Sequence, residues 1–235
     1  MKIALIGRGA MGKLIERLAT EKGHEIGVAI DDADASLSAS DLAGKLKGVE
    51  VAIDFTTASA VRRNVEACVE AGVSLVEGTT GWNTERDVIQ KIVTDGDGSF
   101  VFGANFSIGV NLFYRIVDHA SELFAKFAEY ETFIEEQHHS RKKDAPSGTA
   151  LKIKDIVARH ITKDFSVSAT RAGNIPGTHR VGFDGPADQI LLEHTARSRE
   201  GFAYGAILAA EWIIGKKGFY EFGAVMDEIC QNRER

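Results

Sequence analysis

The densest group of reactive side chains in the sequence lies just before a predicted helix. His138 and His139 are followed by the basic run Arg141-Lys142-Lys143 and then by Ser147-Gly148-Thr149. A histidine titrates near neutral pH and can donate a proton, and a lysine can pair with an anion. The free N–H groups at a helix start, together with the helix dipole, favour a bound carboxylate. The segment therefore predicts a site for a small anionic molecule.

Two other interpretations of this segment stay open. A basic run is most often a solvated face, and paired histidines can ligate a metal. A metal site would need further cysteine, histidine or acidic ligands in a recognisable array, and the sequence shows none, so we expect no metal. This concentration of positive charge stands in a chain of formal net charge −6, which favours a binding site over a solvated face.

A glycine-rich turn near the N-terminus is the second candidate site. Gly7-Arg8-Gly9-Ala10-Met11-Gly12 stands between an apolar run at 2–6 and a helical pattern at 13–20. In this G-x-G-x-x-G pattern the first glycine makes the turn and the second lets a pyrophosphate approach the backbone. The third lets the helix pack on the strand. The pattern predicts a dinucleotide site, and a plain glycine turn is the alternative.

Acidic residues about twenty positions further on bear on the choice of cofactor. Asp31, followed by Asp32, comes directly after the next expected strand, 25–30. A carboxylate there accepts hydrogen bonds from ribose hydroxyls and repels a 2′-phosphate, and this segment contains no cation. We therefore expect NADH to be preferred over NADPH. Arg8 or Lys13 could still reach a phosphate, and the two acids could be solvated loop residues.

Two polar turns follow later strands of the same pattern. Gly78-Thr79-Thr80-Gly81 comes after the expected strand 74–77, and Ala104-Asn105-Phe106-Ser107 follows the expected strand 99–104. Ligands of doubly wound sheets bind beyond the carboxyl ends of the strands, so these turns could line the nicotinamide half of a cofactor. Such residues are also typical of any strand end, and position alone does not separate the two interpretations.

The elements that position these residues follow two patterns. Alternating strands and helices predict an α/β fold with a Rossmann-type, doubly wound parallel sheet. The expected strands are 2–6, 25–30, 49–55, 74–77 and 99–104, with helices at 13–20, 59–71 and 85–94. After residue 104 the pattern indicates a second, α+β domain. Its expected helices are 110–127, 150–161 and 202–214, and its expected strands are 130–137, 165–171, 180–183 and 189–197.

The composition excludes several classes of protein. The chain has 235 residues, of which 44% are hydrophobic and 26% charged, as in globular proteins. Its negative net charge disfavours a protein that coats nucleic acid or an anionic membrane, and no apolar run approaches the length of a membrane span. Cys68 and Cys230 are expected to be reduced thiols. We expect a soluble, cytoplasmic protein with neither nucleic acid nor a membrane as a partner.

The segment from His138 onwards also resembles a known family signature. His138-His139-x-x-Lys142-x-Asp144-Ala145-Pro146-Ser147-Gly148-Thr149-Ala150 is similar to the signature of the dihydrodipicolinate reductases, also called 4-hydroxy-tetrahydrodipicolinate reductases. The resemblance covers nearly the whole chain and includes Asp54-Phe55-Thr56, Pro176-Gly177-x-His179 and Phe219-Tyr220-x-Phe222. It implies reduction of a cyclic dicarboxylate, 4-hydroxy-tetrahydrodipicolinate, to tetrahydrodipicolinate with NADH or NADPH. This reaction belongs to the diaminopimelate route to lysine.

The resemblance also implies roles for particular residues. His138 and Lys142 would serve the proton-transfer step. The substrate carboxylates would be held by His139, Lys142, Ser147, Gly148 and Thr149. The cofactor would lie on Gly7, Arg8, Gly9, Ala10, Met11 and Gly12, on Asp31, on Gly78, Thr79 and Thr80, and on Ala104, Asn105, Phe106 and Ser107.

The resemblance further implies two domains and a homotetramer. The dinucleotide-binding domain would be 1–107, joined by the last segment, 216–235. The substrate-binding domain would be 108–215, and its sheet would join the four subunits.

The chain departs from the family pattern in three places. Its glycine loop is one residue shorter than in many members, Gln137 stands where an apolar residue is common, and the chain is short near 33–47 and 165–178. Other Rossmann reductases, such as aspartate or diaminopimelate dehydrogenases, lack the His138–Thr149 arrangement. The alternative function is a catalytically silent NAD(H)-binding sensor on the same fold, which should have lost His138 and Lys142.

Overall fold

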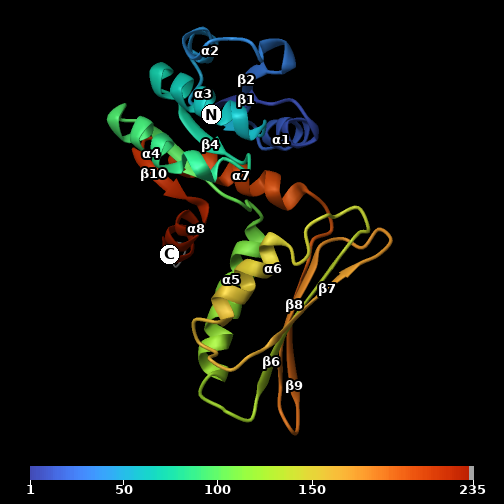
Figure 1. Ribbon diagram of the computed structural model, residues 1–235. Coiled ribbons are helices and arrows are strands. Elements are labelled where there is room, and N and C mark those ends of the chain that lie inside the picture. The colour runs from blue at the N-terminus through green and yellow to red at the C-terminus, as the bar shows by residue number, and fades with distance from the viewer. Residues whose placement is uncertain (233–235) are drawn as a thin grey trace. The chain divides into compact units, whose positions relative to one another are not determined.

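The computed structural model describes residues 1–232 and divides into two units (Figure 1). The first unit comprises Met1–Ile108 and residues 200–232, and the second comprises Gly109–Arg199. This differs from the expected boundary at residue 215. The physical reason is that the helix beginning at Glu200 buries its apolar side chains in the core of the first unit.

The first unit contains a six-stranded sheet in which every strand is parallel to its neighbours. The strand order is β10-β5-β4-β3-β1-β2. The strands are β1 (Lys2–Ile6), β2 (Glu25–Ile30), β3 (Val51–Asp54), β4 (Ser74–Glu77), β5 (Ser99–Phe102) and β10 (Gly218–Glu221). The predicted Rossmann-type sheet is confirmed. All carboxyl ends of the strands therefore lie at one edge, where the turns singled out in the sequence follow them.

Side chains of the central strands point alternately into two cores. On β1, Ile3 and Leu5 belong to one cluster, and Ala4 and Ile6 belong to the other. A sheet buried on both faces needs an unbroken apolar run, which is what this strand shows. The first cluster includes α1 (Ala10–Glu21), α7 (Glu200–Ile213) and α8 (Phe222–Asn232). The second includes α2 (Ala39–Leu46), α3 (Ala58–Ala71) and α4 (Arg86–Asp95).

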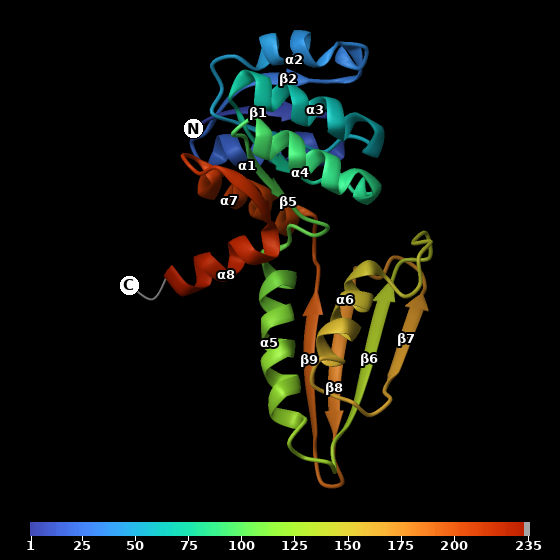
Figure 2. The same cartoon turned by 60° about the vertical axis from the view of Figure 1, so that its left-hand side comes forward.

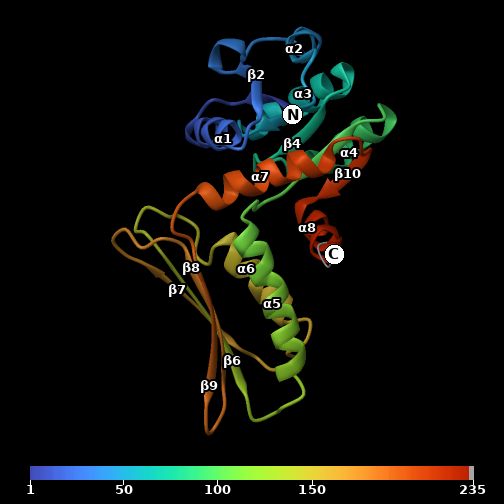
Figure 3. The same cartoon turned by 180° about the vertical axis from the view of Figure 1, so that it is seen from behind.

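The second unit is a four-stranded mixed sheet with two helices on one face, as Figures 2 and 3 show from different sides. Strand β6 (Glu131–His138) pairs in parallel with β7 (Ser166–Arg171) and antiparallel with β8 (Thr178–Asp184), which pairs with β9 (Gln189–Thr195). The helices are α5 (Ile108–Phe124) and α6 (Gly148–Val157). They pack on the sheet through an apolar cluster that includes Phe113, Val117, Ile134, Ile153, Val181 and Phe183. The predicted α+β architecture is confirmed.

Two short 3-10 turns, Asp32–Asp34 and Asn83–Glu85, complete the first unit. Within residues 1–232, none of the helices has the length and apolar character that crossing a membrane requires.

Candidate active site

The glycine turn after β1 leaves the start of α1 open. Gly7 has a φ of +92°, and a Cβ on Gly12 would lie 2.1 Å from the carbonyl oxygen of Gly7, so both positions require glycine. A Cβ on Gly9 would meet nothing within 4 Å. Gly9 is the N-cap residue of α1, and no side-chain hydrogen bond from it occupies the N–H groups of the first turn. The first turn of α1 also has no acidic residue. The exposed backbone N–H groups thus form a cradle that fits a dinucleotide pyrophosphate.

Asp31 and Arg8, two of the side chains that bear on the choice of cofactor, are both held by neighbours. Asp31 is exposed, and its Oδ1 accepts a hydrogen bond from the N–H of Ala33 at 2.9 Å. Arg8 is bound to Glu16, with 3.0 Å between Nη2 and Oε1 and 3.2 Å between Nε and Oε2. Since this guanidinium is already paired, it is a poor candidate for a 2′-phosphate ligand.

Two cations from other parts of the chain reach the loop that follows Asp31. Lys45 of α2 forms an ion pair with Asp34, and Arg63 of α3 donates to the carbonyl oxygen of Ala35. These cations come from helices that follow the loop in the chain, so the segment itself gives no sign of them. Both are occupied by acceptors of the loop.

Two carboxyl groups, Asp54 and Glu77, are fully buried where β3 and β4 end, in paired register. Asn64 Nδ2 donates to Asp54 Oδ2 at 2.6 Å, and the N–H of Thr79 donates to Glu77 Oε1 at 2.7 Å. Burial raises the pKa of both carboxyls, and the charge of Asp54 raises the pKa of Glu77 further. The pair therefore retains a proton on Glu77 at a pH where an exposed glutamate is ionised.

This pair supports the turn that follows β4. Thr79 is buried, and its Oγ1 accepts a hydrogen bond from the N–H of Thr56 at 2.9 Å. A Cβ on Gly78 would lie 2.3 Å from the ring of Phe55, so glycine is required by close packing. Thr80 is the exposed member of the three predicted cofactor residues in this turn.

The turn after β5 is anchored by an aromatic side chain. Phe106 is 2% exposed, and its ring centroid lies 4.6 Å from that of Phe222. Asn105 Oδ1 accepts a hydrogen bond from the N–H of Ser107 at 2.8 Å. The side chain of Phe106 thus belongs to the core, and any contact of this residue with a ligand would be made by its backbone. Ala104 is exposed.

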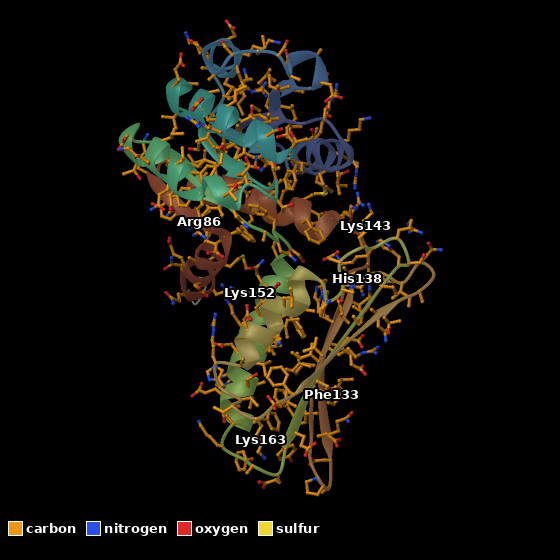
Figure 4. The ribbon with its side chains drawn as sticks, viewed as in Figure 1. Arg86, Phe133, His138, Lys143, Lys152 and Lys163 are labelled. Atoms are coloured by element: carbon orange, nitrogen blue, oxygen red, sulfur yellow. The ribbon has the colours of Figure 1, made fainter. Side chains whose placement is uncertain are left out.

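In the second unit, the end of β6 carries the predicted proton donor. The two-residue period of a strand places Ile134, Glu136 and His138 on one face. Ile134 lies in the helix-covered apolar cluster, so the same face changes from apolar to ionisable toward the end of the strand. Figure 4 shows His138 and Lys143 at this end of the sheet.

Glu136 stands at the centre of a buried polar cluster, with 1% of its surface exposed. Its Oε1 accepts hydrogen bonds from the N–H of Ser147 at 2.9 Å and from Arg171 Nη2 at 2.5 Å. Its Oε2 lies 3.2 Å from His138 Nδ1 and 3.6 Å from His179 Nε2. Burial opposes ionisation, but the hydrogen bonds from Ser147 and Arg171 outweigh it and keep the pKa of Glu136 below its ordinary value.

Glu136, His138 and His179 together raise the question of a metal site, although the sequence shows no recognisable array of metal ligands. One ligand atom each from Glu136, His138 and His179 lies within 4.8 Å of the others. The guanidinium of Arg171, however, already supplies a positive charge to the same carboxylate. We therefore interpret this group as a cluster of paired charges centred on Glu136.

Lys142 and His139 lie on the loop that follows β6. Lys142 is half-buried, and its Nζ lies 2.8 Å from Asp144 Oδ1. Its backbone N–H donates to the carbonyl oxygen of His139 at 3.1 Å. Among residues 1–232, nothing bonds to the buried His139 Nδ1. A substrate carboxylate that binds Lys142 would compete with Asp144 for the ammonium group.

The start of α6 differs from the expectation at Ser147. Its N–H is taken by Glu136, and its Oγ accepts from the N–H of Ala150 and lies 3.1 Å from His179 Nε2. Ser147 is therefore a buried helix cap whose N–H is already bound to Glu136. A Cβ on Gly148 would meet nothing within 4 Å, which leaves this residue open to a carboxylate, and Thr149 is half-buried beside it.

Sequence reasoning named His138 and Lys142 but missed three residues that surround them: Glu136, Arg171 and His179. Two signals were available. Glu136 stands two positions before His138, which places it on the same strand face. His179 belongs to the motif Pro176-Gly177-x-His179, and the strand register pairs it with Glu136. The contact of Arg171 with Glu136 depends on the parallel pairing of β6 with β7, which the sequence does not specify.

Two family models match the chain along most of its length. The model of the dihydrodipicolinate reductase N-terminus matches residues 1–106, and the model of the C-terminus matches residues 109–226. The chain belongs to the dihydrodipicolinate reductase family. Membership of this family, with a Rossmann-type first unit, makes it an oxidoreductase of amino-acid biosynthesis that uses a nicotinamide nucleotide.

Individual relatives agree with the family models. A 4-hydroxy-tetrahydrodipicolinate reductase of Christiangramia forsetii is 33% identical over 244 aligned positions, which cover 99% of this chain and 100% of the relative. One of Archaeoglobus fulgidus is 35% identical over 271 positions, with 98% and 100% covered. The members of this dihydrodipicolinate reductase family are thus matched from end to end.

Solved structures show the same fold. A dipicolinate-bound dihydrodipicolinate reductase from Paenisporosarcina sp. TG-14 superposes with a TM-score of 0.78 at 20% identity, covering 96% of this chain and 99% of that one. An amine dehydrogenase from Mycobacterium smegmatis reaches a TM-score of 0.62 at 10% identity, with 95% of each chain covered. At such identities the similarity concerns the fold alone.

Proposed function

We propose that this protein reduces 4-hydroxy-tetrahydrodipicolinate to tetrahydrodipicolinate in the diaminopimelate route to lysine. The observation that carries the proposal is that the second unit gathers a histidine, a lysine and an open helix start at one end of its sheet. These are a proton donor and two kinds of carboxylate ligand, and the chain belongs to a family whose named relatives carry out this reaction.

The substrate carboxylates are bound by Lys142, His139 and the N-terminus of α6. Lys142 provides a charge, and Gly148 and Thr149 provide the start of a helix whose dipole favours an anion. Ser147 contributes by capping that helix and fixing it to Glu136. Holding the dianion by two groups positions it for reaction and offsets charge that would oppose the transfer of negative charge to its ring.

His138 supplies the proton. Its half-buried ring lies at the end of β6, and Lys142 stands four residues further on. Burial lowers the pKa of His138, Glu136 opposes this shift, and the cations of Lys142 and Arg171 add to it. A histidine with a lowered pKa gives up its proton readily to a base on the substrate.

The cofactor is bound by the first unit. Gly7, Gly9 and the start of α1 hold the pyrophosphate, Asp31 accepts from the ribose, and the turns at 78–80 and 104–107 line the remaining part. When bound, a reduced nicotinamide supplies the hydride for the reaction. NADH is preferred over NADPH, since Asp31 is exposed and the cations Arg8, Lys45 and Arg63 are already paired.

A coupled assay tests this function. The preceding synthase, pyruvate and aspartate semialdehyde generate the substrate, and oxidation of NADH or NADPH is followed at 340 nm. Synthase-dependent oxidation is expected, with a higher kcat/KM for NADH. Binding of NADH without any oxidation would instead support a catalytically silent sensor, and a clear preference for NADPH would overturn the role of Asp31.

We further propose a cytoplasmic homotetramer joined through the sheet of the second unit. Within one chain, the sheet face opposite α5 and α6 carries Phe133, packed on Gly182, and Leu191, which is 46% exposed. Light scattering after size exclusion should give four times the chain mass. Leu191→Glu should lower that mass, whereas Leu151→Glu, at an equally exposed leucine of α6, should not. A monomeric wild type would refute the assembly, and fractionation of cells tests the location.

A further inference from the structure

One nitrogen of the His138 ring faces a fixed carboxylate, and the other lies beside a glycine. Nδ1 lies within ion-pair distance of Glu136 Oε2, at 3.2 Å, and among residues 1–232 neither atom is engaged in a hydrogen bond. On the opposite side, a Cβ built on Gly177 would lie 3.0 Å from His138 Nε2. A side chain at position 177 would therefore crowd Nε2, the ring nitrogen that does not face Glu136.

The carboxylate that faces Nδ1 is itself immobilised. Arg171 Nη2 and the N–H of Ser147 both bind Glu136 Oε1, which leaves Oε2 for His138. A buried carboxylate without such partners would be strongly destabilising. Here Arg171 compensates its charge, and two strands and a helix start fix its position.

We infer that Glu136 is a positioning residue for the proposed reaction, holding His138 through Nδ1 so that the proton is exchanged at Nε2. The inference rests on the proposed role of His138. Glu136 also stabilises the imidazolium form, and it links the proton donor to the helix start that binds the substrate carboxylate, because the same carboxylate accepts the N–H of Ser147.

The second buried histidine of the cluster does not serve as the donor. Burial lowers the pKa of His179 to about 4, and the neighbouring His138 lowers it as well. His179 is therefore neutral near pH 7, and its Nε2 lies 3.1 Å from Ser147 Oγ. It completes the hydrogen bonding of the helix cap.

The charges around His138 determine what loss of Glu136 should do. Glu136 faces the ring from its own strand, Lys142 and Asp144 from the next loop, Arg171 from β7 and His179 from β8. Burial, Lys142 and Arg171 lower the pKa of His138, whereas Glu136 and Asp144 raise it. Removing the charge of Glu136 should therefore lower the pKa of His138 further.

The test combines turnover with an NMR titration of the His138 ring. Glu136→Gln keeps the shape and can still accept the N–H of Ser147. Its amide group, however, places a hydrogen-bond donor against Nδ1. The neutral ring then carries its proton on Nε2, and the imidazolium form loses the carboxylate that stabilised it. We expect kcat to fall about a hundredfold, the Kd of NADH to stay within about twofold, and the pKa of His138 to fall.

Two further variants separate positioning from folding. Glu135→Gln removes a half-buried carboxylate from the opposite face of the same strand, where it pairs with Arg180 at 3.7 Å and does not face His138, so kcat and the pKa of His138 should match those of the wild type. Glu136→Asp keeps the negative charge but, with a side chain one methylene shorter, moves it away from His138. The kcat and the pKa of His138 should therefore take values intermediate between those of the wild type and Glu136→Gln. Should Glu136→Gln fail to fold, Glu136→Asp carries the test alone.

An unchanged pKa of His138 in both Glu136 variants, or a kcat within about threefold of wild type, would overturn the inference. The titration needs no turnover. If wild-type protein showed no reductase activity, the proposed function would fail while the pairing of Glu136 with His138 could still be measured.

Discussion

At the scale of single residues, the ion pair between Lys142 and Asp144 makes a distinct prediction for substrate binding. Lys142→Ala should lower kcat and raise the KM of the dicarboxylate, reducing kcat/KM about 10–100-fold, because a hydrogen bond to a charged group contributes about 1.5–3 kcal/mol. The Kd of NADH should not change. Steady-state kinetics and NADH titration measure these values. Lys143→Ala, which removes the exposed lysine next to it, is the control; equal losses in both variants would contradict a specific role for Lys142.

The lowered pKa of His138 gives a second prediction at this scale. A proton donor must be protonated to act, so kcat/KM should fall as the pH rises through the pKa of His138. In the free enzyme this midpoint should lie below the ordinary value of 6.5. His138→Ala should lower kcat about 100-fold and remove that limb of the profile. A limb that persists in His138→Ala would belong to the substrate or to another group.

At the scale of elements, the ends of β3 and β4 are joined by the carboxyl pair Asp54 and Glu77. Their pKa values are raised in the folded state, so the stability they contribute is fully present below their unfolded pKa values and is lost as the pH rises through the folded ones. In Glu77→Gln the side chain that faces Asp54 is neutral at every pH, so its burial beside Asp54 does not depend on protonation. The free energy of unfolding of the variant, relative to that of the wild type, should therefore rise by about 1 kcal/mol between about pH 5 and 8. This corresponds to about 2–4 °C in Tm.

Thermal unfolding across this pH range measures the difference. Glu221→Gln, an exposed carboxyl at the end of β10 in the same sheet, should give a constant difference from wild type. A Glu77→Gln curve that runs parallel to wild type at every pH would mean that the folded pair holds no proton.

The elements also show what the sequence predicts well. Strand β1, buried on both faces, has the unbroken apolar run Ile3–Ile6, and the expected ranges match β1, β2 and β4. Three elements were missed. They are α2, β10 and α8. Helix α2 is only eight residues long. Strand β10 ends at Glu221 and α8 begins at Phe222, so no turn residues separate the two elements in the sequence.

The site was predicted in part for a related reason. His138, Lys142 and the helix start lie within one short segment, so local sequence brings them together. Arg171 and His179 reach Glu136 only through pairing of β6 with β7 and β8. Likewise, Lys45 and Arg63 reach the loop after Asp31 from later helices. Contacts between distant segments are not visible in a single sequence.

At the scale of the whole molecule, each unit has its own apolar core and, in the proposed function, its own ligand. Calorimetry should then show two transitions. NADH at 100 times its Kd should stabilise the first unit by about 2.7 kcal/mol. Dipicolinate, a dicarboxylate, should move the other transition. A single transition moved equally by both ligands would show instead that the units unfold together.

The late position of α7 in the chain has a consequence for biosynthesis on the ribosome. This helix contributes buried residues to the first unit: Ala203, Gly205, Ala206, Ile207, Ala209, Ala210 and Ile213. They are translated only after the whole of Gly109–Arg199, about 5–20 s later at ordinary elongation rates. During that interval five strands of the sheet have emerged, while one apolar face is covered by α1 but still lacks α7 and α8. The nascent chain therefore exposes apolar surface that chaperones can bind until translation is nearly complete. Slow codons within residues 109–199 would prolong that exposure.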